Sequence, residues 1–257
     1  MKHLSKIIAV TNQKGGVGKT TTAVNLSALL AEAGKKVLLI DIDPQGNATS
    51  GLGRADTDSN TVYEVLLGDA PAKDALVDTD IEALRLMPTS IELAGAEIEL
   101  VSVENRERLL KAALESIRGD YDYIFIDCPP SLSLLTLNAL TAADSVLIPI
   151  QCEYYALEGV GQLVNTIKLM KKKLNPELCI EGILLTMYDA RTNLCAQVAQ
   201  EVRNHFGEEA FDTLIPRNVR LSEAPSFGLP IHMYDAKCAG ALAYRELAGE
   251  FIERNGG

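Results

Sequence analysis

A glycine-rich stretch near the start of the chain, Gln13-Lys14-Gly15-Gly16-Val17-Gly18-Lys19-Thr20, has the residue types and spacing of a phosphate-binding loop. Its three glycines let the backbone turn so that several N–H groups face one concavity, and a following helix would add its positive N-terminal end. The Lys19 side chain then suits the β- and γ-phosphates of a nucleotide, and the Thr20 hydroxyl suits Mg²⁺. A glycine-rich turn that binds nothing is the competing interpretation, which the Lys-Thr pair argues against.

The loop departs from the general pattern G-x-x-x-x-G-K-[ST] in one place. Gln13 replaces the first glycine of that pattern, and an additional lysine, Lys14, stands directly before the double glycine. A general phosphate-binding loop does not account for Lys14.

Carboxylates stand at the ends of two expected strands. Asp41 ends the apolar run 36–41 with Asp43 two residues later, and Asp127 ends the run 121–127. Beside a magnesium–phosphate site, the first pair suits contacts to metal-bound water and the orientation of an attacking water, and Asp127 suits the water shell of Mg²⁺. Each has a plain structural alternative: an Asp-Pro turn for the first pair, and a helix cap for Asp127.

Short apolar runs alternate with helical patterns along the whole chain. Strand patterns cover 6–11, 36–41, 84–88, 121–127, 145–150 and 180–187, and helical patterns cover 20–32, 61–67, 91–100, 105–117, 156–174, 193–206 and 240–253. Successive strand–helix–strand units close right-handed and place a ligand at the carboxyl ends of the strands. The sequence therefore predicts an α/β fold, a doubly wound, mostly parallel sheet flanked by helices, in a single domain spanning residues 1–257.

Composition narrows the classes of protein. No apolar run in the 257 residues reaches the roughly 18 that a membrane-spanning helix needs, and no signal-peptide pattern precedes the first strand. We therefore expect a cytoplasmic protein. The five cysteines are widely spaced and form no C-x-x-C pair, which argues against a disulfide framework and against a zinc site.

The net charge of −11 is unevenly distributed along the chain. Residues 1–164 hold 13 Lys and Arg against 23 Asp and Glu, whereas residues 165–257 hold 11 against 12, so a basic face in the C-terminal third is compatible with an acidic protein. Lys171-Lys172-Lys173 end a predicted helix, where helix capping and DNA contact are equal alternatives. The turn-rich, acidic segment 51–80 is either a partner-facing surface or a solvated insertion.

The loop variant KGGVGKT is the signature of the deviant Walker A ATPases, a P-loop NTPase family that includes ParA-type partition proteins, MinD-like proteins and the nitrogenase iron protein. Further blocks, among them DIDPQGNATSGLG, YDYIFIDCPPSL, QCEYYALEG and IPRNVRLSEAPSFG, resemble the chromosomal ParA branch, often called Soj. The blocks lie between about residue 6 and about residue 235, so the resemblance covers nearly the full chain.

This resemblance implies a magnesium-dependent ATPase that converts ATP to ADP and phosphate. Members of the family dimerise around two ATP molecules, bind double-stranded DNA without sequence preference as the ATP dimer, and are stimulated by the centromere-binding protein ParB, also called Spo0J-type. The resemblance therefore implies a nucleoid-associated homodimer that takes part in chromosome or plasmid partition and has no membrane partner.

The resemblance also implies roles for individual residues. Lys14 would reach across the dimer to the partner's nucleotide, Lys19 would hold the phosphates in its own protomer, and Asp43 would position or activate the attacking water. Thr20 and Asp127 would hold Mg²⁺, and Arg191 and Arg220 would contact DNA. The full nucleotide site would comprise Lys14, Gly15, Gly16, Val17, Gly18, Lys19, Thr20 and Thr21 in the loop, with Pro216, Arg217 and Asn218 around the adenine.

Three other functions are compatible with the same fold. A MinD-like membrane switch would use a basic amphipathic C-terminal helix, whereas residues 243–254 are net acidic. A redox carrier like the nitrogenase iron protein would share an iron–sulfur cluster between two chains, and Cys128 is the only cysteine in a suggestive position. An ATP-dependent ligase would need a small-substrate pocket, which no segment indicates.

Overall fold

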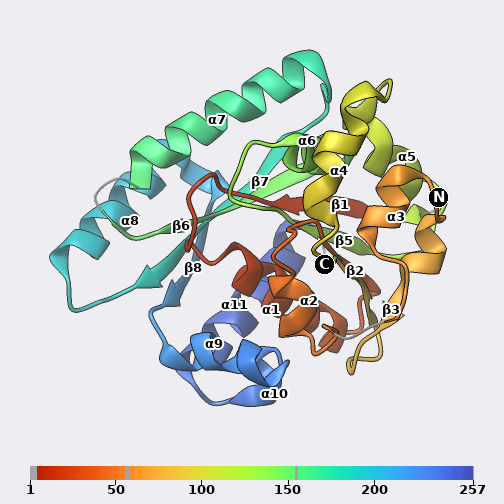
Figure 1. The fold of residues 1–257 in the computed structure, drawn as a ribbon. Helices are drawn as coiled ribbons and strands as arrows, with labels where there is room; N and C mark the ends of the chain where they lie inside the picture. The colour runs from red at the N-terminus through yellow and green to blue at the C-terminus, as the bar shows by residue number, and fades with distance from the viewer. Residues whose placement is uncertain (1–4, 56–57, 154–155, 257) are drawn as a thin grey trace.

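The computed structural model describes residues 5–55, 58–153 and 156–256. Within these residues eight strands form one sheet in the order β3-β4-β2-β5-β1-β6-β7-β8 (Figure 1). β3 is antiparallel to β4, and every other neighbouring pair is parallel. The strands are β1 (Lys6–Val10), β2 (Val37–Asp41), β3 (Val77–Asp78), β4 (Leu84–Met87), β5 (Tyr123–Asp127), β6 (Ser145–Gln151), β7 (Cys179–Tyr188) and β8 (Ala210–Pro216).

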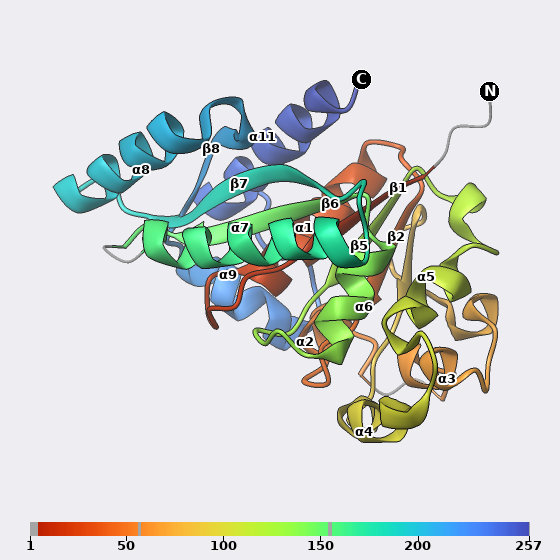
Figure 2. The same cartoon turned by 90° about the horizontal axis from the view of Figure 1, so that it is seen from above.

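Helices cover both faces of this sheet (Figure 2). α1 and α11 pack on one face, and α5, α6, α7 and α8 contribute to the core on the other face. The helices are α1 (Lys19–Glu32), α2 (Asn47–Gly51), α3 (Val62–Leu67), α4 (Leu93–Glu99), α5 (Leu109–Leu114), α6 (Leu134–Ala142), α7 (Ala156–Lys173), α8 (Asn193–Phe206), α9 (Val219–Glu223), α10 (Ile231–Tyr234) and α11 (Ala239–Arg254).

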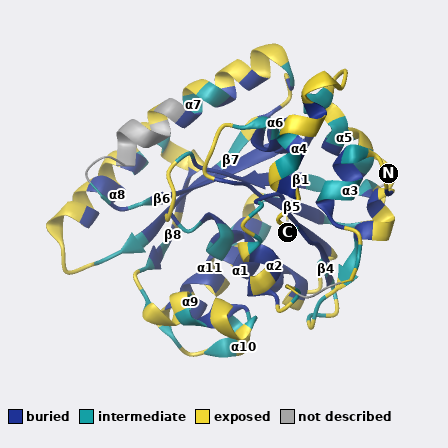
Figure 3. Cartoon of the chain, viewed as in Figure 1, coloured by how far each residue is buried: buried dark blue, intermediate teal, exposed yellow. Residues whose placement is uncertain are grey.

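The central strands are apolar at nearly every position because both faces of the sheet are covered. In β1, Ile7 and Ala9 belong to the core that contains α6 and α7, whereas Ile8 and Val10 belong to the core that contains α1 and α11. Figure 3 shows that the central strands are mostly buried and that exposed positions lie on the outer sides of the helices. Successive residues of each strand therefore stabilise opposite layers of the fold.

The strand register brings the ends of three strands together. Asp41 at the end of β2 is the register partner of Asp127 at the end of β5, and Asp127 is also the partner of Val10 at the end of β1. The glycine-rich loop leaves β1 at this same edge. The edge formed by the carboxyl ends of parallel strands is where ligands bind in such sheets.

The predicted α/β fold with a mostly parallel sheet is confirmed, but several of its elements do not follow from the sequence pattern. The predicted helix 105–117 is wrong in extent, because only α5 is α-helical and short 3₁₀ turns precede and follow it. α6 is buried around most of its circumference, so its sequence has no polar face to reveal a helical period. β8 and the two-residue β3 are likewise unpredicted.

The acidic segment 51–80 is more than a solvated insertion. Its helix α3 begins with a capping box, in which Thr61 and Glu64 each satisfy a backbone N–H at the helix start. Val62, Val65 and Leu66 of this helix are buried in the core. The segment therefore adds a packed layer beside β4.

No helix in the described part of the chain combines the length and the apolar character needed to cross a lipid bilayer.

Candidate functional site

The glycine-rich loop connects β1 to α1 with a backbone that needs glycine at two positions. Gly16 and Gly18 have φ angles of 74° and 86°, a region that side chains disfavour. The loop is also anchored from outside: Thr186 of β7 donates a hydrogen bond from its hydroxyl to the carbonyl of Val17 at 2.9 Å. Val17 is itself 1% exposed and belongs to the buried core, so it fixes the loop from beneath.

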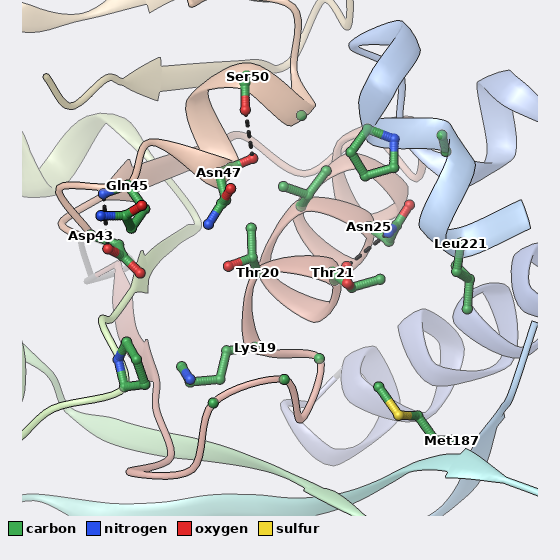
Figure 4. Close-up of a pocket in the computed structure, with 18 of the residues that line it drawn as sticks. Lys19, Thr20, Thr21, Asn25, Asp43, Gln45, Asn47, Ser50, Met187 and Leu221 are labelled. Atoms are coloured by element: carbon green, nitrogen blue, oxygen red, sulfur yellow. Dashed lines mark hydrogen bonds between the residues drawn. The ribbon is translucent and has the colours of Figure 1, made fainter. Parts of the chain in front are cut away.

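This loop forms one wall of a cavity of about 440 Å³. Figure 4 shows Lys19, Thr20 and Asp43 around the same space. The other lining residues come from α1, the segment after β2, α2, the loop after β5, the end of β7 and the segment around α9. The complete lining is Gly15, Gly16, Gly18, Lys19, Thr20, Thr21, Val24, Asn25, Asp43, Gln45, Asn47, Ser50, Gly51, Pro130, Met187, Leu221, Ala224, Pro225 and Leu229. The cavity therefore lies at the sheet edge where the sequence predicts a nucleotide.

Lys19 is a buried cation in this cavity. Its Nζ donates to the carbonyl of Lys14 at 3.2 Å, which closes the loop around the side chain. Burial lowers the pKa of Lys19, and the nearby Asp127 opposes that shift. A polyphosphate in the cavity would favour the charged form, because an adjacent anion offsets the cost of burying the ammonium.

Thr20 and Asp127 meet directly below the cavity. The Thr20 hydroxyl donates to Oδ2 of Asp127 at 2.7 Å. The other oxygen, Oδ1, is buried and has no hydrogen-bond partner among the described residues. Burial, with a contribution from Asp41, raises the pKa of Asp127 well above its ordinary value.

These two residues fit a magnesium ion. A hydroxyl and a buried carboxylate oxygen without a partner are the hard oxygen donors that Mg²⁺ takes, together with water and phosphate. No cluster of three or more His, Cys, Asp or Glu suited to a metal occurs in the described ranges. The helix-cap alternative for Asp127 is wrong, because the next helix, α6, begins at Leu134 after the N-cap residue Ser133.

Asp41 lies behind the cavity and holds the backbone around it. Its Oδ2 accepts hydrogen bonds from the backbone N–H and the hydroxyl of Thr49, both at 2.8 Å, and its Oδ1 accepts from the N–H of Asp43 at 3.2 Å. Burial raises the pKa of Asp41 to about 6. Direct contact of Asp41 with metal-bound water, as the sequence suggests for the pair, therefore does not fit its position.

Asp43 lines the cavity and is 7% exposed. Its carboxylate accepts from the N–H of Gln45 at 3.0 Å, and its carbonyl accepts from the N–H of Gly46 at 2.9 Å. The turn proposed as the plain alternative is thus present, and the same turn points the carboxylate toward Lys19 and Thr20 (Figure 4). The catalytic role of Asp43 stays a prediction.

A second cavity of about 280 Å³ adjoins the first and has Pro216, Arg217 and Asn218 in its lining. Both cavities share residues of the loop, of β7 and of the segment around α9, namely Gly18, Thr21, Met187, Leu221 and Pro225. The loop residues and the predicted adenine segment, about 200 positions apart in sequence, therefore border one continuous depression.

Several lining residues do not follow from motif reasoning. Met187 borders both cavities and has a φ angle of 51°, which is rare outside glycine. Leu221 also borders both, and Asn47 and Ser50 line the first from α2. Only their place relative to the strands could have indicated these residues from sequence: Met187 lies near the end of one strand, and Asn47 follows shortly after the end of another.

Lys14 stands apart from its own cavity. It is absent from the lining among the described residues, and its half-exposed side chain forms an ion pair with Glu153, just after β6. Such an outward position suits the predicted contact with a second nucleotide, which stays a prediction.

Arg191 and Arg220 lie in the segments that follow the neighbouring strands β7 and β8. Arg191 donates to both oxygens of Asp189 at 2.9 and 2.7 Å, and its side chain is 87% exposed. Arg220 donates to Glu223 at 2.8 Å and is 49% exposed. The two arginines do not contact each other, and their DNA contacts stay predictions.

The lysines at the end of α7, Lys171, Lys172 and Lys173, are exposed. Exposed lysines in the last turn of a helix are compatible with helix capping and with DNA contact, so both alternatives stand.

Comparison with known proteins places this geometry in a family. Residues 5–180 match the model of a family described as an AAA domain. The sporulation initiation inhibitor protein Soj of Bacillus subtilis is 61% identical over 255 residues, covering 98% of this chain and 100% of that protein. The chromosome partitioning protein ParA of Myxococcus xanthus is 56% identical over 253 residues, covering 98% of this chain and 89% of that protein.

A solved structure named cobyrinic acid a,c-diamide synthase from Mycobacterium smegmatis, with bound ADP and magnesium, has the same fold. Its TM-score is 0.84 at 43% identity, and the match covers 97% of this chain and 95% of that chain. The identities to Soj and ParA are higher and extend over nearly the whole of this chain. This chain belongs to the Soj/ParA family of chromosome-partitioning ATPases.

Proposed function

We propose that this chain is the ATP-driven switch of a chromosome or plasmid partition system. It binds ATP and Mg²⁺, dimerises around two nucleotides, binds double-stranded DNA without sequence preference in that state, and hydrolyses ATP when a ParB-type partner stimulates it. The observation that carries the proposal is that Lys19, Thr20 and Asp43 line one cavity at the sheet edge, where Thr20 also contacts Asp127.

The chemistry of that constellation suits phosphoryl transfer to water. Such a reaction needs positioning and neutralisation of charge more than covalent chemistry. Lys19 neutralises phosphate oxygens, and Thr20 with Asp127 would hold Mg²⁺, which supplies further positive charge when bound. Asp43, fixed by its turn, is the carboxylate that can orient the attacking water.

Dimerisation is supported by the outward position of Lys14. A second lysine that reaches the nucleotide only from a partner protomer makes ATP binding and dimerisation mutually dependent. A symmetric dimer also repeats every DNA contact, so two exposed arginines per protomer give four phosphate contacts. DNA binding should then depend steeply on salt.

The membrane-switch alternative finds little support. α11 buries Ala241, Tyr244, Leu247 and Phe251 against the rest of the protein, so its apolar face is already occupied. The iron–sulfur alternative needs an accessible cysteine, whereas Cys128 is fully buried and burial raises the pKa of its thiol. We therefore propose a cytoplasmic, nucleoid-associated protein without a membrane partner.

DNA binding measured with ATP, with ADP and without nucleotide, at low and moderate salt, tests the proposal. Of the three conditions, we expect DNA binding only with ATP. We expect that binding to weaken as the salt concentration rises. ATP-dependent flotation on liposomes without DNA binding would refute the partition function and favour the membrane switch.

A further inference from the structure

The ion pair between Lys14 and Glu153 joins two segments that belong to the same protomer. Lys14 lies in the glycine-rich loop after β1, and Glu153 lies shortly after the neighbouring strand β6. The side chains are 50% and 32% exposed, which leaves the pair accessible from outside.

Both ends of this pair are held in place by their backbones. The N–H of Lys14 donates to Oδ1 of Asn12 at 3.1 Å, and the Asn12 amide donates to the carbonyl of Pro149 in β6 at 2.8 Å. On the other side, the N–H of Cys152 donates to the carbonyl of Thr186 in β7 at 3.1 Å. The backbone next to Glu153 is therefore fixed to β7, and this holds the Glu153 carboxylate close to Lys14.

Glu153 competes with a nucleotide for Lys14. An ammonium that neutralises the phosphates of a second protomer cannot keep its full interaction with a carboxylate in its own protomer. A carboxylate left beside those phosphates would also repel them, since like charges at short range destabilise each other. The pair must therefore open or weaken before Lys14 completes a site in trans.

We propose that Glu153 is a latch that holds Lys14 in the unpaired protomer and thereby raises the protein concentration needed for ATP-dependent dimerisation. This inference rests on the proposed role of Lys14 across the dimer. It assigns to Glu153 a positioning role that acts only through Lys14.

The expected size of the effect follows from the exposure of the pair. Exposed ion pairs shift an equilibrium by about 1.5- to 5-fold. A dimer opens one latch in each protomer, so removing both should strengthen dimerisation by the square of that factor, about 2- to 25-fold. The gain should shrink at high salt, because salt screens the pair that wild type must break.

Glu153→Gln tests the latch, and Glu177→Gln is its matched control. Glu177 is an exposed residue between α7 and β7, so the control removes the same charge and affects no ion pair found in the described part of the chain. Sedimentation velocity over a range of protein concentrations, with magnesium and a non-hydrolysable ATP analogue, gives the midpoint of dimerisation. We expect Glu153→Gln to dimerise at a 2- to 25-fold lower concentration than wild type, with Glu177→Gln near wild type.

Lys14→Ala, measured in the same way, separates the latch from the function on which it rests. Failure of wild type to dimerise, or full dimerisation of Lys14→Ala, would refute the role of Lys14 in trans. If that role holds and Glu153→Gln behaves like Glu177→Gln, or dimerises less well than wild type, the latch is refuted. Glu153→Asp, which keeps the charge on a shorter side chain, should fall between wild type and Glu153→Gln.

Discussion

Asp41→Asn tests how much the buried carboxylate of Asp41 destabilises the nucleotide-free protein as the pH rises. Asp41 is completely buried beside Asp127, its register partner, and next to Asp43. Burial is the main cause that raises its pKa from 3.8 to about 6, while hydrogen bonds from Thr49 and from the Asp43 N–H oppose the shift. The ionised carboxylate is therefore less stable in the folded protein than in the unfolded chain.

The sign and the size of the effect follow from that shift. Because the folded-state pKa is the higher one, stability is fully present below about pH 4 and is lost as the pH rises through about 6. A shift of about two units corresponds to roughly 3 kcal/mol in total, of which roughly half is lost between about pH 5 and about pH 8. An asparagine at this position does not titrate and lacks this loss.

Urea unfolding of the nucleotide-free protein at pH 5 and pH 8 provides the measurement. We expect wild type to lose about 1–2 kcal/mol more than Asp41→Asn between these two pH values. Asparagine offers one acceptor oxygen where Asp41 uses two, so the variant is also less stable overall, and the change with pH is the informative quantity. The exposed Asp69→Asn serves as the control and should follow wild type.

Parallel pH dependences for wild type and Asp41→Asn would refute this reasoning. Saturating magnesium and ATP provide a second check, because a cation beside the buried carboxylates favours their ionised forms. The loss of wild-type stability between pH 5 and pH 8 should then become smaller, and an unchanged loss would show that no cation reaches these groups.

Three further predictions concern other parts of the molecule. Asp43→Ala should bind ATP and dimerise but lose nearly all hydrolysis, measured as phosphate release; normal turnover would remove Asp43 from catalysis. The double variant Arg191→Ala/Arg220→Ala should bind DNA more weakly while its ATPase activity without DNA persists. The slope of log binding constant against log salt concentration should fall in magnitude by about 3 to 4, since four phosphate contacts per dimer are lost. Unchanged gel shifts would place the DNA surface elsewhere. Gly228→Ala should destabilise the protein by more than 1 kcal/mol in urea unfolding, because its φ of 65° disfavours a side chain and the new Cβ would lie 2.7 Å from Cα of Gly53; wild-type stability would contradict that close approach.

Motif spacing predicts the centre of the candidate site well. The positions of Lys19, Thr20 and Asp127 follow from a loop between a strand and a helix and from a carboxylate at a strand end, because local sequence determines these features. Asp41 is different: its role depends on the pairing of β2 with β5, and only the sheet order reveals that its neighbour is Asp127. Met187 likewise becomes part of the site only through the packing of β7 beside the loop.

The outer elements show where pattern reasoning fails. α6 lacks a polar face because it is buried on most sides, so periodicity cannot distinguish it from other apolar runs. The pairing of Lys14 with Glu153 is also beyond sequence reasoning, since 139 positions separate two residues that meet only after β6 is placed beside β1.

The position of α11 has a consequence for biosynthesis. Tyr244 of this helix lines the second cavity, and its hydroxyl shares a hydrogen bond of 3.1 Å with the hydroxyl of Thr22 in α1. The glycine-rich loop leaves the ribosome more than 200 residues before Tyr244, which borders the candidate site from the other side. In a nascent chain the loop therefore lacks this wall until α11 has emerged, and any earlier folding intermediate lacks the stabilisation that a ligand bound between the two would give.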